Sequence, residues 1–589
     1  MTISSQKSEY DVVVVGSGAG GLAAAVTAAK HGLDVVVVEK DPLFGGTTAR
    51  SGGVVWIPCS PHARALGIED DIEAARTYLR HEAGSNSDEK RIDAFLRYGP
   101  EMVAFFESNT SVRFVAVPGF SDYHPDAPGG CPGGRSLVAT PFAGTELGEE
   151  IHRLRPPLRE ITFVGMMFNS SLEIAHFFNV TRSLTSALYV VRRLTQHAGD
   201  LLVHRRGMRL GNGNALAARL AKSAFNLGVP ILTSSPARTL LLEEGAVRGV
   251  EIEREGVCTR IRARRGVVLA SGGFSQDPAL RKRLFPHAPT GLEHWTATSP
   301  GTTGDGWRLA ESAGAQTIAD LPNAAAWIPV SLVPRGSGEP GVFPHLIDRY
   351  KPGVIAVTRR GTRFVNESDS YHDFGLALQR TCRDDPEVCA FLICDHRALR
   401  RYGLGFVKPF PLPLFPHLRS GYLLRGRTLR HLAQLTGIDA DALQRTIDAV
   451  NADAHRGVDT QFGKGTTAYN RFLGDASHKP NPCVAPIEEA PFYAVKVVMG
   501  DLATFAGIAT DEHARVLDAR SAPIGGLYAV GNDAASVMGG NYPGGGITLG
   551  PALTFGYIAG RHLAAAADGG RTTWSESGAS TDAAAAAVP

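Results

Sequence analysis

A glycine-rich turn between a buried strand and a helix is the feature that most constrains the fold of this chain. Residues 10–15 are a run of mostly β-branched residues, typical of a strand buried on both faces of a parallel sheet. The motif Gly-x-Gly-x-x-Gly at 16–21 follows directly, and residues 22–31 are rich in helix-forming alanine. A second apolar run at 34–38 completes a strand–helix–strand unit. The pattern predicts an α/β fold with a Rossmann-type nucleotide-binding domain.

The three glycines and the acid after the second strand have separate roles in such a unit. Gly16 permits the tight turn, Gly18 lets the backbone approach a pyrophosphate, and Gly21 allows close packing of the helix. The helix N-terminus offers free N–H groups and a positive dipole to phosphates. Glu39 ends the second strand, where a carboxylate accepts hydrogen bonds from ribose hydroxyls. The sequence therefore predicts a dinucleotide site at this turn.

The length and charge of the chain limit its class. With 589 residues, the chain is too long for one ordinary core and fits two or three domains. Its 60 basic and 58 acidic residues leave a formal charge of +2, and no basic run is long enough to indicate nucleic acid. We therefore expect no nucleic-acid partner.

Cysteine usage and hydropathy indicate a compartment. The 7 cysteines are dispersed, without a Cys-x-x-Cys pair or a Cys-x-x-Cys-His haem motif, so the sequence predicts no metal site. Such a set fits free thiols in a reducing cytoplasm. Residues 1–10 lack the apolar core of a signal peptide, and no apolar stretch reaches the roughly 18 residues of a membrane span. We expect a cytoplasmic protein.

The segment 166–194 mixes apolar side chains with isolated Arg and His. It permits two interpretations: an amphipathic hairpin that makes peripheral contact with a membrane, or a helical excursion packed on its own domain. Packing is favoured, because apolar helical stripes usually face cores.

Composition divides the rest of the chain. A buried strand at 265–273 and another at 525–531 both end in glycine, whereas the section between them is rich in Pro and aromatic residues. We expect an α+β catalytic or capping domain inserted into a split nucleotide-binding domain. The expected divisions are residues 1–320 (with a helical excursion at about 150–200), 321–500, 501–565 and a disordered tail at 566–589.

Three further segments carry a resemblance to a known group. They are Gly-Gly-Thr-Thr-Ala-Arg-Ser-Gly-Gly at 45–53, Gly-Asn-Asp at 531–533 and Gly-Gly-Gly-Ile-Thr-Leu-Gly at 544–550. In these segments the chain resembles the fumarate reductase and 3-ketosteroid dehydrogenase superfamily of flavoproteins, over nearly its whole length except the tail. The resemblance implies FAD as cofactor. The residues that it implies for FAD binding, beyond the four named above, are Lys40, Gly46, Thr47, Thr48, Ser51, Gly52, Gly53, Gly272, Asp533, Thr548 and Leu549.

The branch that reduces dicarboxylates is disfavoured. Its members resemble one another in a Gln-x-His-Pro-Thr segment and in an Asn-Glu-x-x-x-Arg-Asp segment whose arginine is the acid. This chain has no His-Pro-Thr at 323–327, and Tyr371 stands about where the arginine would be. A carboxylate clamp would therefore lack its bidentate partner.

The chain is instead similar to the 3-ketosteroid Δ1-dehydrogenases. The segments 120–130, 366–373 and 537–546 carry the likeness. In that family three tyrosines and a glycine make the catalytic set, and by motif they correspond to Tyr123, Tyr371, Tyr542 and Gly546. The implied substrate is an apolar, steroid-like ketone.

The expected chemistry follows from these groups. The Tyr542 hydroxyl and the Gly546 N–H would polarise the ketone and stabilise the developing enolate. Tyr371, as a phenolate, would take the C2 proton, which requires its pKa of about 10 to be lowered; a hydrogen bond to Tyr123 is a candidate means. The flavin would accept hydride from C1. Aromatic residues of the middle section would line the pocket, for example Phe343, Phe406 and Phe410.

Several alternatives stay open. His124, rather than Tyr123, could face the site, because His is the commoner acid–base group. We expect His372 to be a structural neighbour and Asp122 and Asp126 to be loop residues. An alkene reductase running the same chemistry backwards is the second functional hypothesis, and a flavin-binding redox carrier is the third. No motif identifies the external electron acceptor.

Overall fold

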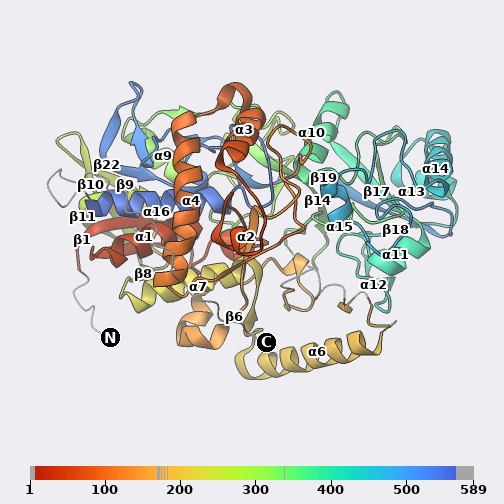
Figure 1. Cartoon of the computed structure of the whole chain (residues 1–589), viewed down its shortest axis with the longest axis horizontal. Coiled ribbons are helices and arrows are strands. Elements are labelled where there is room, and N and C mark those ends of the chain that lie inside the picture. The colour runs from red at the N-terminus through yellow and green to blue at the C-terminus, as the bar shows by residue number, and fades with distance from the viewer. Residues whose placement is uncertain are drawn as a thin grey trace.

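A computed structural model describes residues 7–168, 173, 176–177, 179–181, 183–336 and 338–565. The tail predicted at 566–589 and part of the segment 166–194 lie outside the described residues. The order of strands and helices confirms the α/β class, with two main sheets side by side (Figure 1).

The first sheet carries the predicted glycine turn. Strand β1 (Glu9–Val15) lies at its centre and pairs in parallel with β2 (Val35–Val38) and β11 (Val257–Leu269). The order β21-β22-β11-β1-β2-β8 joins both ends of the chain, with β9 and β10 extending from β11. The outer strands are β8 (Ile231–Leu232), β9 (Ala237–Glu243), β10 (Ala246–Arg254), β21 (Arg515–Leu517) and β22 (Pro523–Ala529).

Helix α1 (Ala19–Lys30) follows β1 after the three residues 16–18 and packs on α16 (Leu549–Ala565). Both helices are buried along most of their length, and small side chains let their backbones approach closely. A methyl group at Gly556 would lie 2.5 Å from the carbonyl oxygen of Gly20. Figure 1 shows the blue C-terminal helix beside the red N-terminal unit. The two chain ends therefore build one nucleotide-binding layer.

The second sheet has β19 (Phe492–Thr504) at its centre. Its other strands are β12 (Trp295–Thr296), β14 (Ala325–Val333), β15 (Gly341–Pro344), β16 (Val354–Val357), β17 (Cys389–Cys394) and β18 (Leu424–Gly426). The sheet thus takes strands from 295–504, slightly beyond the expected insertion at 321–500. We retain the two-domain division as a proposal, with its boundaries moved to the ends of this sheet.

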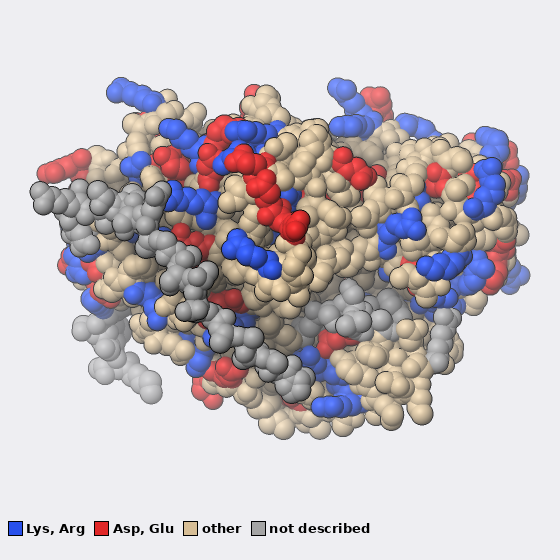
Figure 2. Space-filling model, viewed as in Figure 1, with Lys and Arg blue, Asp and Glu red and all other residues tan. Residues whose placement is uncertain are grey.

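The remaining helices pack around these sheets. A small sheet of β3 (Val54–Trp56), β4 (Phe114–Ala116) and β5 (Ser136–Ala139) lies beside α3 (Ile72–Ala83) and α4 (Glu89–Asn109). The helices that matter to the site are α7 (Asn212–Asn226), α10 (Tyr371–Thr381) and α15 (Ala468–Leu473). On the face shown in Figure 2, basic and acidic side chains are intermingled.

Helix α6 (Leu184–His204) projects along one side of the molecule (Figure 1). Val190 is buried, but Leu184, Leu188, Val191 and Leu202 are exposed, with Leu202 reaching 86%. The expectation that the segment 166–194 packs its apolar stripe on its own domain is therefore wrong for Leu184, Leu188 and Val191, and peripheral membrane contact stays a prediction. No described helix is long and apolar enough to cross a bilayer.

The packing of α16 on α1 yields a stability prediction. Gly556→Ala places a Cβ against the Gly20 backbone, so we expect a loss of about 1–3 kcal/mol in the free energy of unfolding, measured by urea denaturation. Gly199→Ala is the matched control, because Gly199 is a helical glycine with open space around it. We expect that control to change stability by no more than about 1 kcal/mol, in the stabilising direction. Equal losses in both variants would contradict this account of the interface.

Candidate active site

A cavity of about 340 Å³ lies beyond the carboxyl ends of β1, β2 and β11, where the first sheet meets the second. Its wall includes residues from both sheets and from α15. The four predicted catalytic residues all line it: Tyr123, Tyr371, Tyr542 and Gly546. Segments more than 400 positions apart in the chain therefore meet at one place.

The three tyrosines form a compact cluster of buried phenols. The rings of Tyr123 and Tyr542 stack with centroids 5.4 Å apart, and Tyr371 meets both edge-on at 5.5 and 5.0 Å. The hydroxyl of Tyr123 donates to that of Tyr371 at 3.0 Å. Each of the three side chains is at least 94% buried, so this polar cluster is shielded from bulk water.

Local structure fixes each tyrosine. Tyr371 begins α10, where the Ser370 side chain caps the helix by accepting from the N–H of Asp373. The N–H of Tyr123 donates to the Pro543 carbonyl at 2.9 Å, which ties Tyr123 to the residue after Tyr542. These constraints hold the hydroxyls in place before any substrate binds.

Gly546 is a glycine by necessity. Its φ is +103°, and a Cβ there would lie 2.6 Å from the backbone nitrogen of Trp56. Among the residues that the structure describes, the Gly546 N–H has no acceptor, and Gly546 lines the cavity. That N–H is available to a ligand oxygen.

A buried carboxylate supports the Tyr123 loop. Asp122 accepts from the indole N–H of Trp56 at 2.8 Å, from Arg135 at 2.7 Å and from the N–H of Cys131 at 3.0 Å. Burial raises the pKa of Asp122 to about 6, against the effect of Arg135. The expectation that Asp122 is a simple loop residue is therefore wrong, because only tertiary structure brings these donors together.

His124 points away from the cavity. Its Nδ1 lies 2.9 Å from Glu82 and its Nε2 lies 3.0 Å from Asp373, so it bridges α3 and α10. Burial alone would lower the pKa of His124, but the hydrogen bonds to Asp373 and Glu82 raise it to about 11. Tyr123, and not His124, faces the site. His372 donates to no catalytic group and accepts from the N–H of Trp327, as a structural neighbour would.

The middle section does supply aromatic residues to the cavity wall, Tyr371 and Tyr469, but the three phenylalanines predicted there are wrong. Phe343, Phe406 and Phe410 are absent from the cavity wall, because Phe343 is buried in the second core and Phe410 is 51% exposed. The wall is instead aliphatic over much of its area, with Phe120 and Tyr469 added. Its aliphatic members beyond the nucleotide end are Leu158, Ile161, Pro344, Leu346, Ile347, Leu473 and Leu502.

Comparison with known proteins shows the family. Residues 11–549 match the family described as FAD binding domain. The chain is 40% identical over 570 residues to a 3-oxosteroid 1-dehydrogenase of Mycobacterium tuberculosis, covering 94% of this chain and 98% of the relative. It is 41% identical over 565 residues to a 4-oxocyclohex-2-ene-1-carboxylate 5-dehydrogenase of Sinomonas cyclohexanicum, covering 95% of each.

A solved structure agrees with these relatives. The 3-ketosteroid Δ1-dehydrogenase of Sterolibacterium denitrificans, in complex with 1,4-androstadiene-3,17-dione, aligns with a TM-score of 0.88 and 36% identity, over 95% of this chain and 100% of that one. This chain belongs to the 3-ketosteroid Δ1-dehydrogenase family. It is an FAD-dependent oxidoreductase of the fumarate reductase and succinate dehydrogenase flavoprotein superfamily.

The residues at the nucleotide end fit the FAD of this family. Glu39 is held by the N–H of Ser17 at 3.1 Å and that of Asp41 at 2.9 Å, with its carboxylate at the cavity wall. The Thr48 hydroxyl accepts from the N–H of Ala19 at 2.9 Å. The predicted FAD-binding residues that line the cavity are Gly16, Gly18, Glu39, Lys40, Gly46, Thr47, Thr48, Ser51, Gly52, Gly53, Gly272, Thr548 and Leu549.

Two predicted FAD-binding residues lie behind the wall. A Cβ on Gly21 would lie 2.1 Å from the Gly16 carbonyl oxygen, so Gly21 allows the helix to pack. Asp533 accepts from the N–H groups of Ser271 and Gly273 at 2.5 and 2.9 Å, and it therefore fixes that turn. Its neighbour Asn532 lines the cavity instead. We keep any direct contact of Asp533 with FAD as a proposal only.

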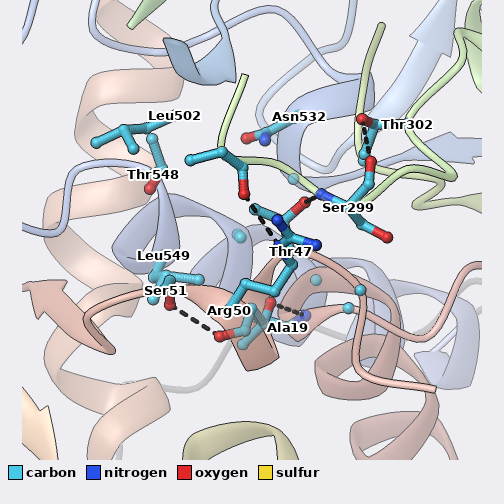
Figure 3. Close-up of a pocket in the computed structure, with 18 of the residues that line it drawn as sticks. Ala19, Thr47, Arg50, Ser51, Ser299, Thr302, Leu502, Asn532, Thr548 and Leu549 are labelled. Carbon is cyan, nitrogen blue, oxygen red and sulfur yellow. Dashed lines mark hydrogen bonds between the residues drawn. The ribbon is translucent and has the colours of Figure 1, made fainter. Parts of the chain in front are cut away.

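Arg50 is a cation in the wall that sequence analysis did not single out. Its Nε donates to the Ala297 carbonyl at 3.1 Å, and no carboxylate pairs with it among the described residues. Burial, followed by repulsion from Arg155, lowers its pKa to about 10. Figure 3 shows Arg50 beside Thr47 and Ser299. An anionic group bound in the cavity could form an ion pair with Arg50.

The bridge made by His124 gives a pH-dependent prediction. The pKa of His124 in the folded state is about 11, above the ordinary 6.5. Charged His124 therefore contributes its full stabilisation below about pH 6.5, and that stabilisation is lost as the pH rises through 11. His124→Gln should therefore lower the free energy of unfolding more at mildly acidic than at strongly alkaline pH. Denaturant unfolding of both proteins across that range measures the difference. A constant difference would contradict a charged bridge.

Proposed function

We propose that this protein introduces a C1–C2 double bond into a 3-ketosteroid or a related fused-ring ketone. The observation that carries the proposal is the meeting of Tyr371, Tyr542 and the unpaired N–H of Gly546 at the apolar end of the cavity. The aliphatic wall suits a flat apolar substrate.

Each group has a distinct part in this reaction. The Tyr542 hydroxyl and the Gly546 N–H donate to the ketone oxygen, which makes the neighbouring C2–H acidic and stabilises the enolate. The Tyr371 oxygen receives the C2 proton, and Tyr123 donates a hydrogen bond to that oxygen. Bound FAD supplies the two-electron oxidant that takes hydride from C1.

The phenol cluster has an electrostatic difficulty. Burial raises the pKa of Tyr371 well above its ordinary value, and the neighbouring Tyr123 and Tyr542 act in the same direction. The hydrogen bond from Tyr123 alone therefore does not meet the need for a phenolate, and a positive charge is required nearby.

The first test is chemical. Anaerobic mixing of the FAD-loaded protein with androst-4-ene-3,17-dione should bleach the flavin absorbance, with a product two hydrogens lighter by mass. Tyr371→Phe should slow bleaching by about 100-fold or more, because it removes the proton acceptor, while FAD stays bound. Tyr422→Phe is the matched control, because Tyr422 is a buried, hydrogen-bonded phenol outside the cavity. Equal rates in wild type and Tyr371→Phe would remove Tyr371 from the mechanism.

A carboxylated cyclohexenone is a second candidate substrate, and Arg50 favours it. The Sinomonas relative is named for such a substrate, and Arg50 offers an unpaired cation. Arg50→Met should raise the KM for 4-oxocyclohex-2-ene-1-carboxylate about tenfold or more, and leave the steroid unaffected, if the cation binds this carboxylate. Loss of FAD from Arg50→Met would instead assign Arg50 to the cofactor phosphates.

Direction and location complete the proposal. We propose oxidation of the ketone as the physiological direction, with an external electron acceptor. Reduction of an enone by the reduced protein, without the forward reaction, would favour the alkene reductase.

All seven cysteines are free, which supports a cytoplasmic location.

A further inference from the structure

Arg349 is a cation buried in the core without a carboxylate. Its exposure is 0%, and no acid lies within ion-pair distance among the described residues. Its guanidinium donates to three carbonyl oxygens, those of His345 at 3.1 Å, Glu367 at 2.6 Å and Asp369 at 3.3 Å. Carbonyl dipoles solvate the guanidinium without forming an ion pair, so its positive charge acts on neighbouring groups, among them the carboxyl groups of Asp348 and Asp369.

A line of phenols starts at this cation. Arg349 donates to the Tyr350 hydroxyl at 3.2 Å, and its guanidinium lies over the Tyr350 ring at 5.0 Å. The hydroxyls of Tyr350 and Tyr469 are 2.7 Å apart. The Tyr350 hydroxyl also donates to the Asp369 carbonyl oxygen at 3.2 Å. Its hydrogen bond with Tyr469 is shorter and therefore the stronger of the two.

The line continues to the catalytic cluster. Tyr469, at the start of α15, packs on Tyr123 with ring centroids 4.6 Å apart, and it lines the same cavity. Burial raises the pKa of Tyr123 well above its ordinary value, and the hydrogen bonds that it shares with Tyr371 and Tyr469 act in the opposite direction. Tyr123 in turn donates to Tyr371. Three phenols, those of Tyr350, Tyr469 and Tyr123, thus connect the guanidinium to Tyr371, the proposed proton acceptor.

We propose that Tyr469 and Tyr350 are positioning residues that couple Tyr371 to the charge of Arg349, so that the cation stabilises the phenolate needed for proton abstraction. The inference rests on the proposed function. Arg349 donates to Tyr350, the Tyr350 and Tyr469 hydroxyls share a hydrogen bond, and the Tyr469 ring contacts that of Tyr123, so the cation lies at one end of a contiguous row of phenols that ends at Tyr371.

The charged groups that face this row of phenols are consistent with the proposed role of Arg349. Arg349 lowers the pKa of both Tyr350 and Tyr469, against the dominant effect of burial, whereas Asp369 raises that of Tyr350. Burial, followed by Asp373, raises the pKa of Asp369 to about 6, which weakens its opposition at acidic pH. A guanidinium does not give up its proton. The row of phenols therefore stabilises the negative charge on Tyr371 and is not the exit route for the abstracted proton.

The experiment compares the pH profiles of Tyr469→Phe and Tyr350→Phe with wild type, using FAD-loaded protein. The rate of flavin bleaching is measured with androst-4-ene-3,17-dione and with 4-oxocyclohex-2-ene-1-carboxylate. We expect the acidic limb of the profile to move up by about one pH unit in both variants, with about a tenfold loss below its midpoint and recovery at alkaline pH. Arg349→Met should give the same shift, and Arg349→Lys should restore the wild-type profile.

A second readout needs no substrate. Tyrosinate absorbance in the ultraviolet is titrated for Tyr469→Phe and for the control Tyr422→Phe, each of which lacks one buried phenol. The proposal expects the first tyrosine to titrate at higher pH in Tyr469→Phe and at wild-type pH in the control.

The outcomes separate the hypotheses. A uniform loss of rate at all pH values, or unchanged profiles, would overturn the coupling and leave a packing role. If neither ketone bleaches wild-type flavin, the proposed function fails, and the tyrosinate titration still decides the coupling: identical curves for Tyr469→Phe and the control overturn it. Should Arg349→Met not fold, the two tyrosine variants and Arg349→Lys keep the test decisive.

Discussion

The close packing of α16 on α1 is the contact on which the site depends. Gly556 and Gly20 let the two backbones meet without intervening side chains, and this fixes the second half of the nucleotide-binding layer against the first. The segment that precedes α16 carries both Tyr542 and Gly546. Because the helices meet so closely, those two residues line the same cavity as the glycine turn.

The same packing buries three phenols together, and this opposes the formation of the phenolate that the reaction needs. Burial raises the pKa of all three phenols; Tyr123 and Tyr542 raise that of Tyr371 further, whereas the hydrogen bond with Tyr371 lowers those of Tyr123 and Tyr542. We infer that a positive charge outside the cavity stabilises the phenolate. It is the Arg349 guanidinium, which carbonyl oxygens solvate and which phenol side chains connect to the cluster. This arrangement keeps the cation itself out of the cavity, whose wall beyond the nucleotide end is apolar. An apolar ketone can then bind without displacing a charged side chain.

Charged groups behind the cavity wall keep its tyrosines in place. Asp122 binds Arg135 and Trp56 beneath the Tyr123 loop, and His124 joins the helix that bears Tyr371 to α3. Both residues adjoin Tyr123 in sequence, yet neither reaches the cavity. Their hydrogen bonds account for a phenol cluster that is ordered before substrate binds, which lowers the cost of aligning it with the ketone.

The sequence by itself determined the glycine turn and Glu39, because the local geometry of a strand–turn–helix unit dictates those residue types. It indicated the cofactor class and the four residues that line the cavity through the resemblance of short motifs to a known family. Tertiary structure alone decided the rest. It turned His124 away, placed Asp533 behind the wall, replaced Phe343, Phe406 and Phe410 by aliphatic residues, and brought Arg349, Tyr350 and Tyr469 to the cluster. The physical reason is distance along the chain: these contacts join residues more than 100 positions apart, and no local pattern of polarity records which buried partner a side chain will find.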